Sequence, residues 1–258
     1  MSRSRTRSLL SHAAAALASL AAALPAQARA QSHVLPVPYG VGERLEYDVK
    51  FGKLRVGSGS MEVMKVEAIR GRESWHTLFQ VHAGNFFYRV NDQFESWIDR
   101  QTGNSLRFQQ NLNEGRRDVE RIFEIFPERS AFIEQGDTLE KSVRNPLDDG
   151  SFLYFLRTIP LVVGETYSFD RYFRPDRNPV TIHVLRRERV EVPAGTFDAI
   201  VVQPVIKTKG IFSENGHAEV WLADDPTHIM LQMKSGLSFG SINLYLRSYR
   251  PASATAAR

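Results

Sequence analysis

The sequence contains no cysteine, and this absence excludes several classes of protein. Without thiols there is no disulfide framework, and there are no cysteine ligands for a metal ion. A lipid cannot be attached to a cysteine either, so we expect a soluble protein and not a lipoprotein. Stability must therefore come from an ordinary hydrophobic core, for which a hydrophobic content of 42% is ample.

Long apolar runs are also scarce. The run from Leu9 to Leu24 has 16 residues, which is short of the roughly 20 residues that a membrane-spanning helix needs. Arginines precede this run, and a proline and two small-residue sites follow it. The combination predicts a secretory signal peptide over residues 1–30, cut near Ala28 or Ala30. We therefore expect a periplasmic protein with no transmembrane segment in the mature chain.

A net positive charge is missing from the mature chain. The full sequence has 33 Lys and Arg against 29 Asp and Glu, a net charge of +4. Four of the arginines and no acidic residue lie within residues 1–30, so cleavage after Ala30 leaves 29 residues of each sign. Nucleic-acid binding needs a basic surface on the mature domain. We therefore expect no nucleic-acid partner.

Alternation of apolar and polar residues, by contrast, is abundant after residue 43. Leu45, Tyr47, Val49 and Phe51 fall on one side of a strand, with polar residues between them. This period of two predicts a half-buried strand. The same pattern recurs in residues 75–82, 106–113, 180–185, 201–205, 218–222, 229–233 and 242–246.

Short turns rich in glycine and asparagine separate these runs, which predicts antiparallel pairing of consecutive strands. A long antiparallel sheet must twist and curl. We therefore predict an all-β fold, either a single strongly curved antiparallel sheet or a half-open barrel. The predicted domain covers residues 43–250, after an extended lead-in over 31–42 and before a disordered tail over 251–258.

Residues 146–160 depart from the strand pattern. Asp148 or Asp149 can cap a helix, apolar residues then recur near helical spacing, and Pro160 ends the segment. We predict one short covering helix near residues 148–159. Such a helix in a β protein plugs the end of a barrel or covers the concave face of a sheet.

Three stretches together resemble a known family. They are Val41–Val49 (VGERLEYDV), the helical segment 148–157 with its LYFLR core followed by Val-Gly-Glu, and Val192–Phe197 (VPAGTF) followed by residues 220–226 and 240–242. Their order and spacing resemble DUF3108, an uncharacterised family of exported bacterial proteins. The resemblance implies an exported, mostly β domain, and it supplies no catalytic residues.

One formal catalytic motif is present, the G-x-S-x-G of residues 236–240 around Ser238. A nucleophile elbow needs a helix after the serine, and an acid and a histidine later in the chain. Here a predicted strand follows, and no Asp, Glu or His occurs after Ser238. We interpret the motif as a hairpin turn.

Metal and acid–base chemistry also lack a clear pattern. His76 and His82 share a strand face but lie about 20 Å apart, too far to bind one ion as a pair. His228 follows two aspartates in a segment typical of a turn. The pair Asp148-Asp149 lies at the predicted start of the helix, where a carboxylate serves as the N-cap. We therefore predict no metal, no cofactor and no enzymatic activity; the alternative is a hydrolase of envelope polymers that uses carboxylates.

Aromatic residues are numerous, with 16 Phe, 8 Tyr and 3 Trp, and a run of three at residues 86–88. Most should pack in the core, but a curved sheet under an aromatic helix can also enclose an apolar cavity. Our leading hypothesis is a binding protein for a lipid or other apolar envelope component. The candidate ligand-binding residues are Phe152, Tyr154, Phe155, Arg157 and Trp221. The alternative is a structural or assembly factor that binds an envelope protein through a sheet edge.

Overall fold

The computed structural model describes residues 34–84, 89–114, 117–207, 218–237 and 240–253. Contacts divide the chain into two units, Met1–Ser32 and His33–Arg258, and all described residues belong to the second. The predicted signal peptide, Ser238 and the aromatic run at 86–88 lie outside the described residues.

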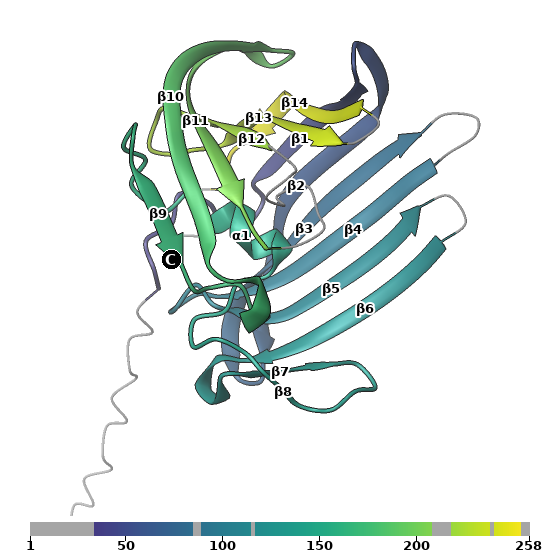
Figure 1. Ribbon diagram of the computed structural model, residues 1–258, viewed down its shortest axis with the longest axis vertical. Coiled ribbons are helices and arrows are strands. Elements are labelled where there is room, and N and C mark those ends of the chain that lie inside the picture. The colour runs from purple at the N-terminus through teal and green to yellow at the C-terminus, as the bar shows by residue number, and fades with distance from the viewer. Residues whose placement is uncertain (1–33, 85–88, 115–116, 208–217, 238–239, 254–258) are drawn as a thin grey trace, which may run out of the picture. The chain divides into compact units, whose positions relative to one another are not determined.

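One antiparallel sheet of 14 strands makes up most of this unit. Its order is β8-β7-β6-β5-β4-β3-β2-β1-β14-β13-β12-β11-β10-β9. Every pair of neighbouring strands is consecutive in sequence except β14 and β1, whose pairing joins two meanders into one sheet (Figure 1). The strands are β1 (Arg44–Phe51), β2 (Leu54–Ile69), β3 (Arg72–Gly84), β4 (Arg89–Asp99), β5 (Ser105–Glu114), β6 (Arg117–Phe126), β7 (Ala131–Glu134), β8 (Glu140–Lys141), β9 (Thr166–Phe169), β10 (Val180–Val192), β11 (Gly195–Val205), β12 (Glu219–Ala223), β13 (Met230–Leu237) and β14 (Gly240–Arg250).

The sheet is strongly curved but not closed, which confirms the predicted fold class. Its two edge strands, β8 and β9, are not paired with each other. The N–H of Ser105, at the start of β5, donates to the carbonyl of Pro146, and the N–H of Phe173, between β9 and β10, donates to the carbonyl of Leu147. The segment around Leu147 therefore bridges β5 in one meander and the segment after β9 in the other.

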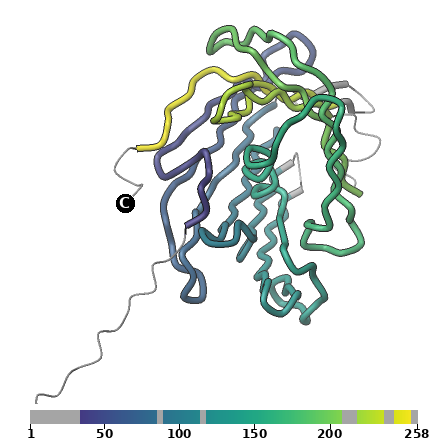
Figure 2. The backbone as a smooth tube through the Cα atoms, turned by 90° about the vertical axis from the view of Figure 1, so that its left-hand side faces the viewer, coloured from purple at the N-terminus to yellow at the C-terminus, as the bar shows by residue number. Residues whose placement is uncertain are grey.

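The α-helix α1 (Asp149–Phe155) begins directly after this bridge. The chain therefore carries it between the two halves of the curved sheet (Figures 1 and 2). Its side chains Phe152 and Leu153 join a single core cluster with inward-facing residues of both meanders. The predicted short helix is thus present, and it occupies the concavity.

Aromatic side chains fill much of this core. The rings of Phe94, Phe108 and Phe123 stack in sequence across β4, β5 and β6, with centroids 6.4 and 5.9 Å apart. Phe173 packs against Phe123 and Phe132 at 5.1 Å each. Ring pairs at these distances add stability beyond the area they bury. The abundance of phenylalanine is therefore largely explained by core packing.

Two residues depart from the strand pattern. Phe51 was expected on the buried face of the first strand, but its side chain is 41% exposed because β1 ends there at a hairpin tip. His76 was expected on a polar face, yet it is 5% exposed. The ring of Trp97 on β4 covers it, stacked at 4.1 Å.

Candidate functional site

The start of α1 is held by a buried carboxylate. Oδ1 of Asp148 accepts hydrogen bonds from the N–H groups of Gly150 (2.9 Å) and Ser151 (2.8 Å) and from the hydroxyl of Ser96 (2.6 Å). The Ser151 hydroxyl accepts the N–H of Asp148 in return, which completes a capping box. Burial raises the pKa of Asp148 to about 6. Within the described part of the chain, its Oδ2 atom has no hydrogen-bond partner.

The adjacent acid, Asp149, faces different partners. It accepts hydrogen bonds from the hydroxyl of Tyr172 (2.8 Å) and from the side-chain amide of Gln110 (3.1 Å). Arg177 donates to the same Tyr172 hydroxyl. Burial raises the pKa of Asp149. The two acids thus connect the start of the helix to β4, β5 and the segment after β9. Each carboxylate accepts hydrogen bonds from a different set of donors.

The residues that follow α1 hold a buried ion pair. The guanidinium of Arg157 binds the carboxylate of Glu43 through two hydrogen bonds of 2.8 and 2.9 Å, and both side chains are 1% exposed. The remaining donors of Arg157 reach the carbonyls of Thr227 and Pro38 at 3.0 Å. The hydroxyl of Tyr249 donates to Glu43. This group ties the lead-in, the helix segment, the β12–β13 turn and β14 together.

Four of the five predicted ligand-binding residues lie in or beside α1. Phe152, Tyr154 and Arg157 are buried in the core. Phe155 is half-buried, packs edge-on against Phe169 at 5.2 Å, and lies under the guanidinium of Arg171. The structure therefore brings these four together around the helix, mostly as core residues.

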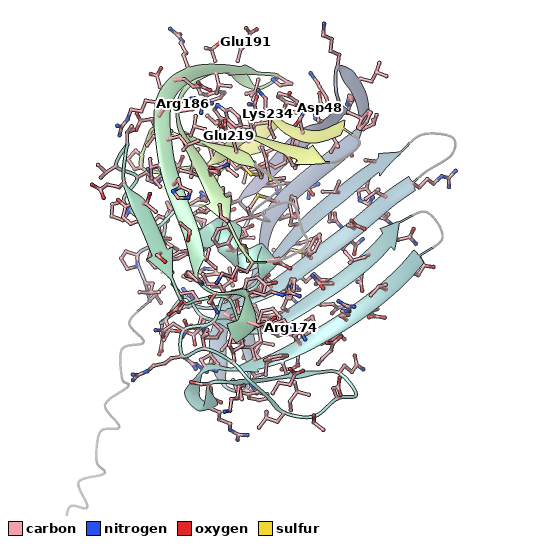
Figure 3. The ribbon with its side chains drawn as sticks, viewed as in Figure 1. Asp48, Arg174, Arg186, Glu191, Glu219 and Lys234 are labelled. Carbon is pink, nitrogen blue, oxygen red and sulfur yellow. The ribbon has the colours of Figure 1, made fainter. Side chains whose placement is uncertain are left out.

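Trp221 lies apart from the other four. Strand alternation places it on the opposite face of β12 from Val220 and Leu222, yet it is also buried, at 3% exposed, and belongs to the main core cluster. Its indole N–H donates to Glu188, and the cations of Arg186 and Lys234, both labelled in Figure 3, lie 5.7 and 4.8 Å from its ring. Trp221 is therefore a buried ring covered by charged side chains.

The inner face of β3–β6 continues beyond the core with alternating apolar and polar cross-strand pairs, since Asp92 lies opposite Val81 and Gln110 opposite Arg121. Its apolar part consists of half-buried residues that pair across neighbouring strands: Phe79 with Phe94, Ala83 with Val90, and Leu112 with Val119. Val81 lies on the same face of β3 as Phe79 and also packs against the core cluster. We call these seven residues the distal wall. Sequence reasoning missed it as a site, although the alternation in β3 and β5 was its signal.

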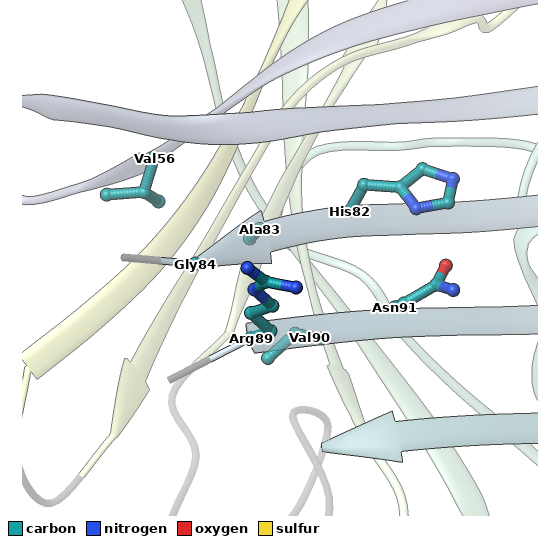
Figure 4. A pocket seen from close by; sticks show the side chains of 7 residues that line it. All are labelled: Val56, His82, Ala83, Gly84, Arg89, Val90 and Asn91. Atoms are coloured by element: carbon teal, nitrogen blue, oxygen red, sulfur yellow. The ribbon is translucent and has the colours of Figure 1, made fainter. Parts of the chain in front are cut away.

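Two hollows lie at the far ends of these strands. One, of about 420 Å³, is lined by Val56, Ala83 and Val90 together with His82, Gly84, Arg89 and Asn91 (Figure 4). The other, of about 320 Å³, is lined by Leu112 and Val119 with polar residues of β5 and β6. Both contain members of the distal wall. Neither lining includes a residue of α1.

Within the described ranges, no group of three or more His, Cys, Asp or Glu side chains is placed to hold a metal ion. The His228 segment forms a turn, in which its N–H donates to the carbonyl of Asp225. None of the helices among the described residues has the length and apolarity to cross a membrane.

The fold and this site define an open, barrel-like β protein built around one internal helix. A model of the family "Protein of unknown function (DUF3108)" matches residues 46–247. The chain therefore belongs to the DUF3108 family. No curated protein matches the sequence.

A solved structure shares the architecture. A β-barrel-like protein of domain of unknown function DUF1849 from Brucella abortus is 10% identical, with a TM-score of 0.55 over 83% of this chain and 99% of that one. At this identity the likeness concerns the fold alone. A candidate lipoprotein from Parabacteroides distasonis (13% identical, TM-score 0.38, 85% and 100% covered) and a candidate exported protein with a YmcC-like fold from Bacteroides fragilis (10%, 0.32, 84% and 100%) are more distant.

Proposed function

We propose that this protein is a non-enzymatic periplasmic protein that binds a lipid or other apolar envelope component on the concave side of its sheet. The observation that carries the proposal is the distal wall. It continues the inner face of β3–β6 beyond the core with half-buried apolar cross-strand pairs, next to polar residues such as Asp92. Ligand sites combine apolar side chains with a few polar groups that fix the orientation of the ligand. The two hollows at this end pair apolar members of the distal wall with polar and charged side chains.

The polar groups near α1 support a binding role over a catalytic one. The two acids with raised pKa values, Asp148 and Asp149, are adjacent in sequence, and each is engaged by donors that hold the helix start. A glycosidase instead needs two carboxylates that face each other across a substrate cleft. Export through a cleaved signal at residues 1–30 is part of the proposal.

The sheet edges favour the concave face over an edge as the binding surface. The edge strand β8 has two residues, Glu140 and Lys141, and both are charged and exposed. The other edge strand, β9, has four residues. Short and charged edge strands discourage pairing with another chain. A protein partner bound by edge addition is therefore the weaker hypothesis.

The test is the displacement of an apolar fluorescent probe, N-phenyl-1-naphthylamine, by phospholipid and fatty acid. Val81→Asp places a second carboxylate in the distal wall, directly opposite Asp92, and should lower probe affinity at least ten-fold, because charge next to an apolar ligand is costly to desolvate. Leu78→Asp is the matched control: it makes a similar change on the same strand, at a half-buried position on the opposite face. Equal probe binding by both variants, with both folded by circular dichroism, would contradict the proposal.

A further inference from the structure

The tip of the β1–β2 hairpin carries two large exposed apolar side chains. Phe51 is 41% exposed and Leu54 is 71% exposed. They are register partners on either side of the turn Gly52-Lys53, so both point to the same side of the hairpin. Gly52 has φ +57°, in the left-handed region that such a tight turn needs.

The same tip is cationic. Within residues 48–55 there are three cations, Lys50, Lys53 and Arg55, against one carboxylate, Asp48. Lys50 and Arg55 are register partners, one position further from the turn than Phe51 and Leu54, so they project to the other side of the hairpin. Asp48, labelled in Figure 3, forms an ion pair with Arg55 at 2.9 Å, and the ammonium of Lys50 lies 4.7 Å from the ring of Tyr245. Lys53, in the turn itself, takes part in neither contact.

This arrangement makes the hairpin amphipathic. All five residues from Phe51 to Arg55 are exposed, and none of them is acidic. At the surface of an anionic bilayer, exposed apolar side chains enter the boundary between headgroups and acyl chains, while cations contact the phosphates. An acidic protein surface would match the cations, and a neutral apolar one would match Phe51 and Leu54. An anionic bilayer offers both kinds of contact side by side, and we therefore favour it.

We infer that the β1–β2 hairpin tip, Phe51 to Arg55, docks this protein onto the surface of an anionic phospholipid membrane. This inference goes beyond the proposed ligand site and does not depend on it. The hairpin nevertheless adjoins that site, because Val56, the next residue along β2, lines the larger hollow. Docking would therefore bring the hollow close to the lipid surface.

The test is flotation of the purified protein with vesicles. Vesicles of phosphatidylglycerol and phosphatidylethanolamine should bind the wild type at least ten times more strongly than vesicles of phosphatidylcholine. This preference should weaken as the salt concentration rises, because salt screens surface charges. Every variant carries the same N-terminal residues, so differences among variants report the hairpin.

Three variants separate the contributions. The double variant Phe51→Ser, Leu54→Ser should lose at least ten-fold in binding, because the apolar area no longer enters the interface. Lys53→Gln should lose about five-fold, the usual contribution of one cation near an anionic surface. The control Val162→Ser, Val163→Ser removes another exposed apolar pair, outside the hairpin, and should bind as the wild type does.

The possible results are distinct. Loss of vesicle binding in the hairpin variants with unchanged thermal unfolding supports the inference. Absence of wild-type binding to anionic vesicles, or undiminished binding by the Phe51→Ser, Leu54→Ser variant, overturns it. A concentration-dependent dimer in size-exclusion chromatography that the double variant abolishes, without vesicle binding, would assign the tip to a second copy of the chain and also overturn it. The probe assay with Val81→Asp tests the ligand site independently of all these outcomes.

Discussion

Asp148 should make the stability of this protein depend on pH in an unusual direction. In the folded state burial raises its pKa from the ordinary value of 3.8 to about 6. The folded protein therefore holds this proton more tightly than the unfolded chain does. Its contribution to stability is fully present below pH 3.8 and is lost as the pH rises through 6. Most carboxylates in ion pairs act in the opposite direction.

The size of the effect follows from the pKa difference. Each unit of difference between the folded-state and unfolded-state pKa corresponds to about 1.4 kcal/mol. Ionisation of Asp148 should therefore lower the unfolding free energy by about 3 kcal/mol between pH 3.8 and pH 7. Asp148→Asn removes this titration. The asparagine keeps an oxygen that can accept the three hydrogen bonds from Gly150, Ser151 and Ser96. The variant should therefore gain stability relative to the wild type as the pH rises from 4 to 7.

The assay is urea unfolding followed by tryptophan fluorescence at several pH values between 4 and 7. The quantity compared is the difference in unfolding free energy between variant and wild type, so that other titrating groups largely cancel. Asp137→Asn, at an exposed turn, is the matched control for the chemical change. The difference in unfolding free energy could instead stay constant across this range, or move in favour of the wild type as the pH rises. Either result would show that the pKa of Asp148 is not raised in the folded state.

Other predictions concern the buried ion pair and the packing of β2 on β3. Arg157→Met should lower the unfolding free energy by about 3–5 kcal/mol in urea, because it leaves Glu43 buried and unpaired; Arg187→Met, at an exposed pair, should cost about 1 kcal/mol or less. A double variant that also carries Glu43→Gln should recover part of the loss, and a strictly additive result would contradict the pairing. Gly57→Ala should cost about 1–3 kcal/mol in thermal unfolding, because a Cβ there would lie 1.9 Å from a carbonyl oxygen of β3. Ser58→Ala, at the next position, should change the unfolding temperature little. Equal effects of the two changes would show that β3 does not approach the backbone at Gly57 this closely.

Local patterns explain why much of the fold could be predicted. The alternation from Leu45 to Val49 appears in the structure as alternating burial, since strand geometry turns successive side chains to opposite faces. Asp148 was a candidate cap from its position alone, and it does cap α1. Curvature followed from the length of the sheet. These features depend on neighbouring residues and on general properties of strands.

Long-range partners could not be predicted in this way. Arg157 was proposed as a contact for ligand, but its partner Glu43 lies 114 positions earlier and is reached only because α1 enters the concavity. The burial of His76 depends on Trp97 of the neighbouring strand. Trp221 is a different case, since alternation within residues 218–222 already placed it on the other face from the predicted core residues.

The ligand proposed for the concave face along β3–β6 can be sought directly. The measurement is mass spectrometry of an organic extract of the protein purified without detergent from a bacterial periplasm, compared with the Val81→Asp variant purified in the same way. We expect a lipid or other apolar molecule in a stoichiometric amount with the wild type and a strongly reduced amount with the variant. An extract free of apolar molecules, or equal amounts from both proteins, would contradict the proposal.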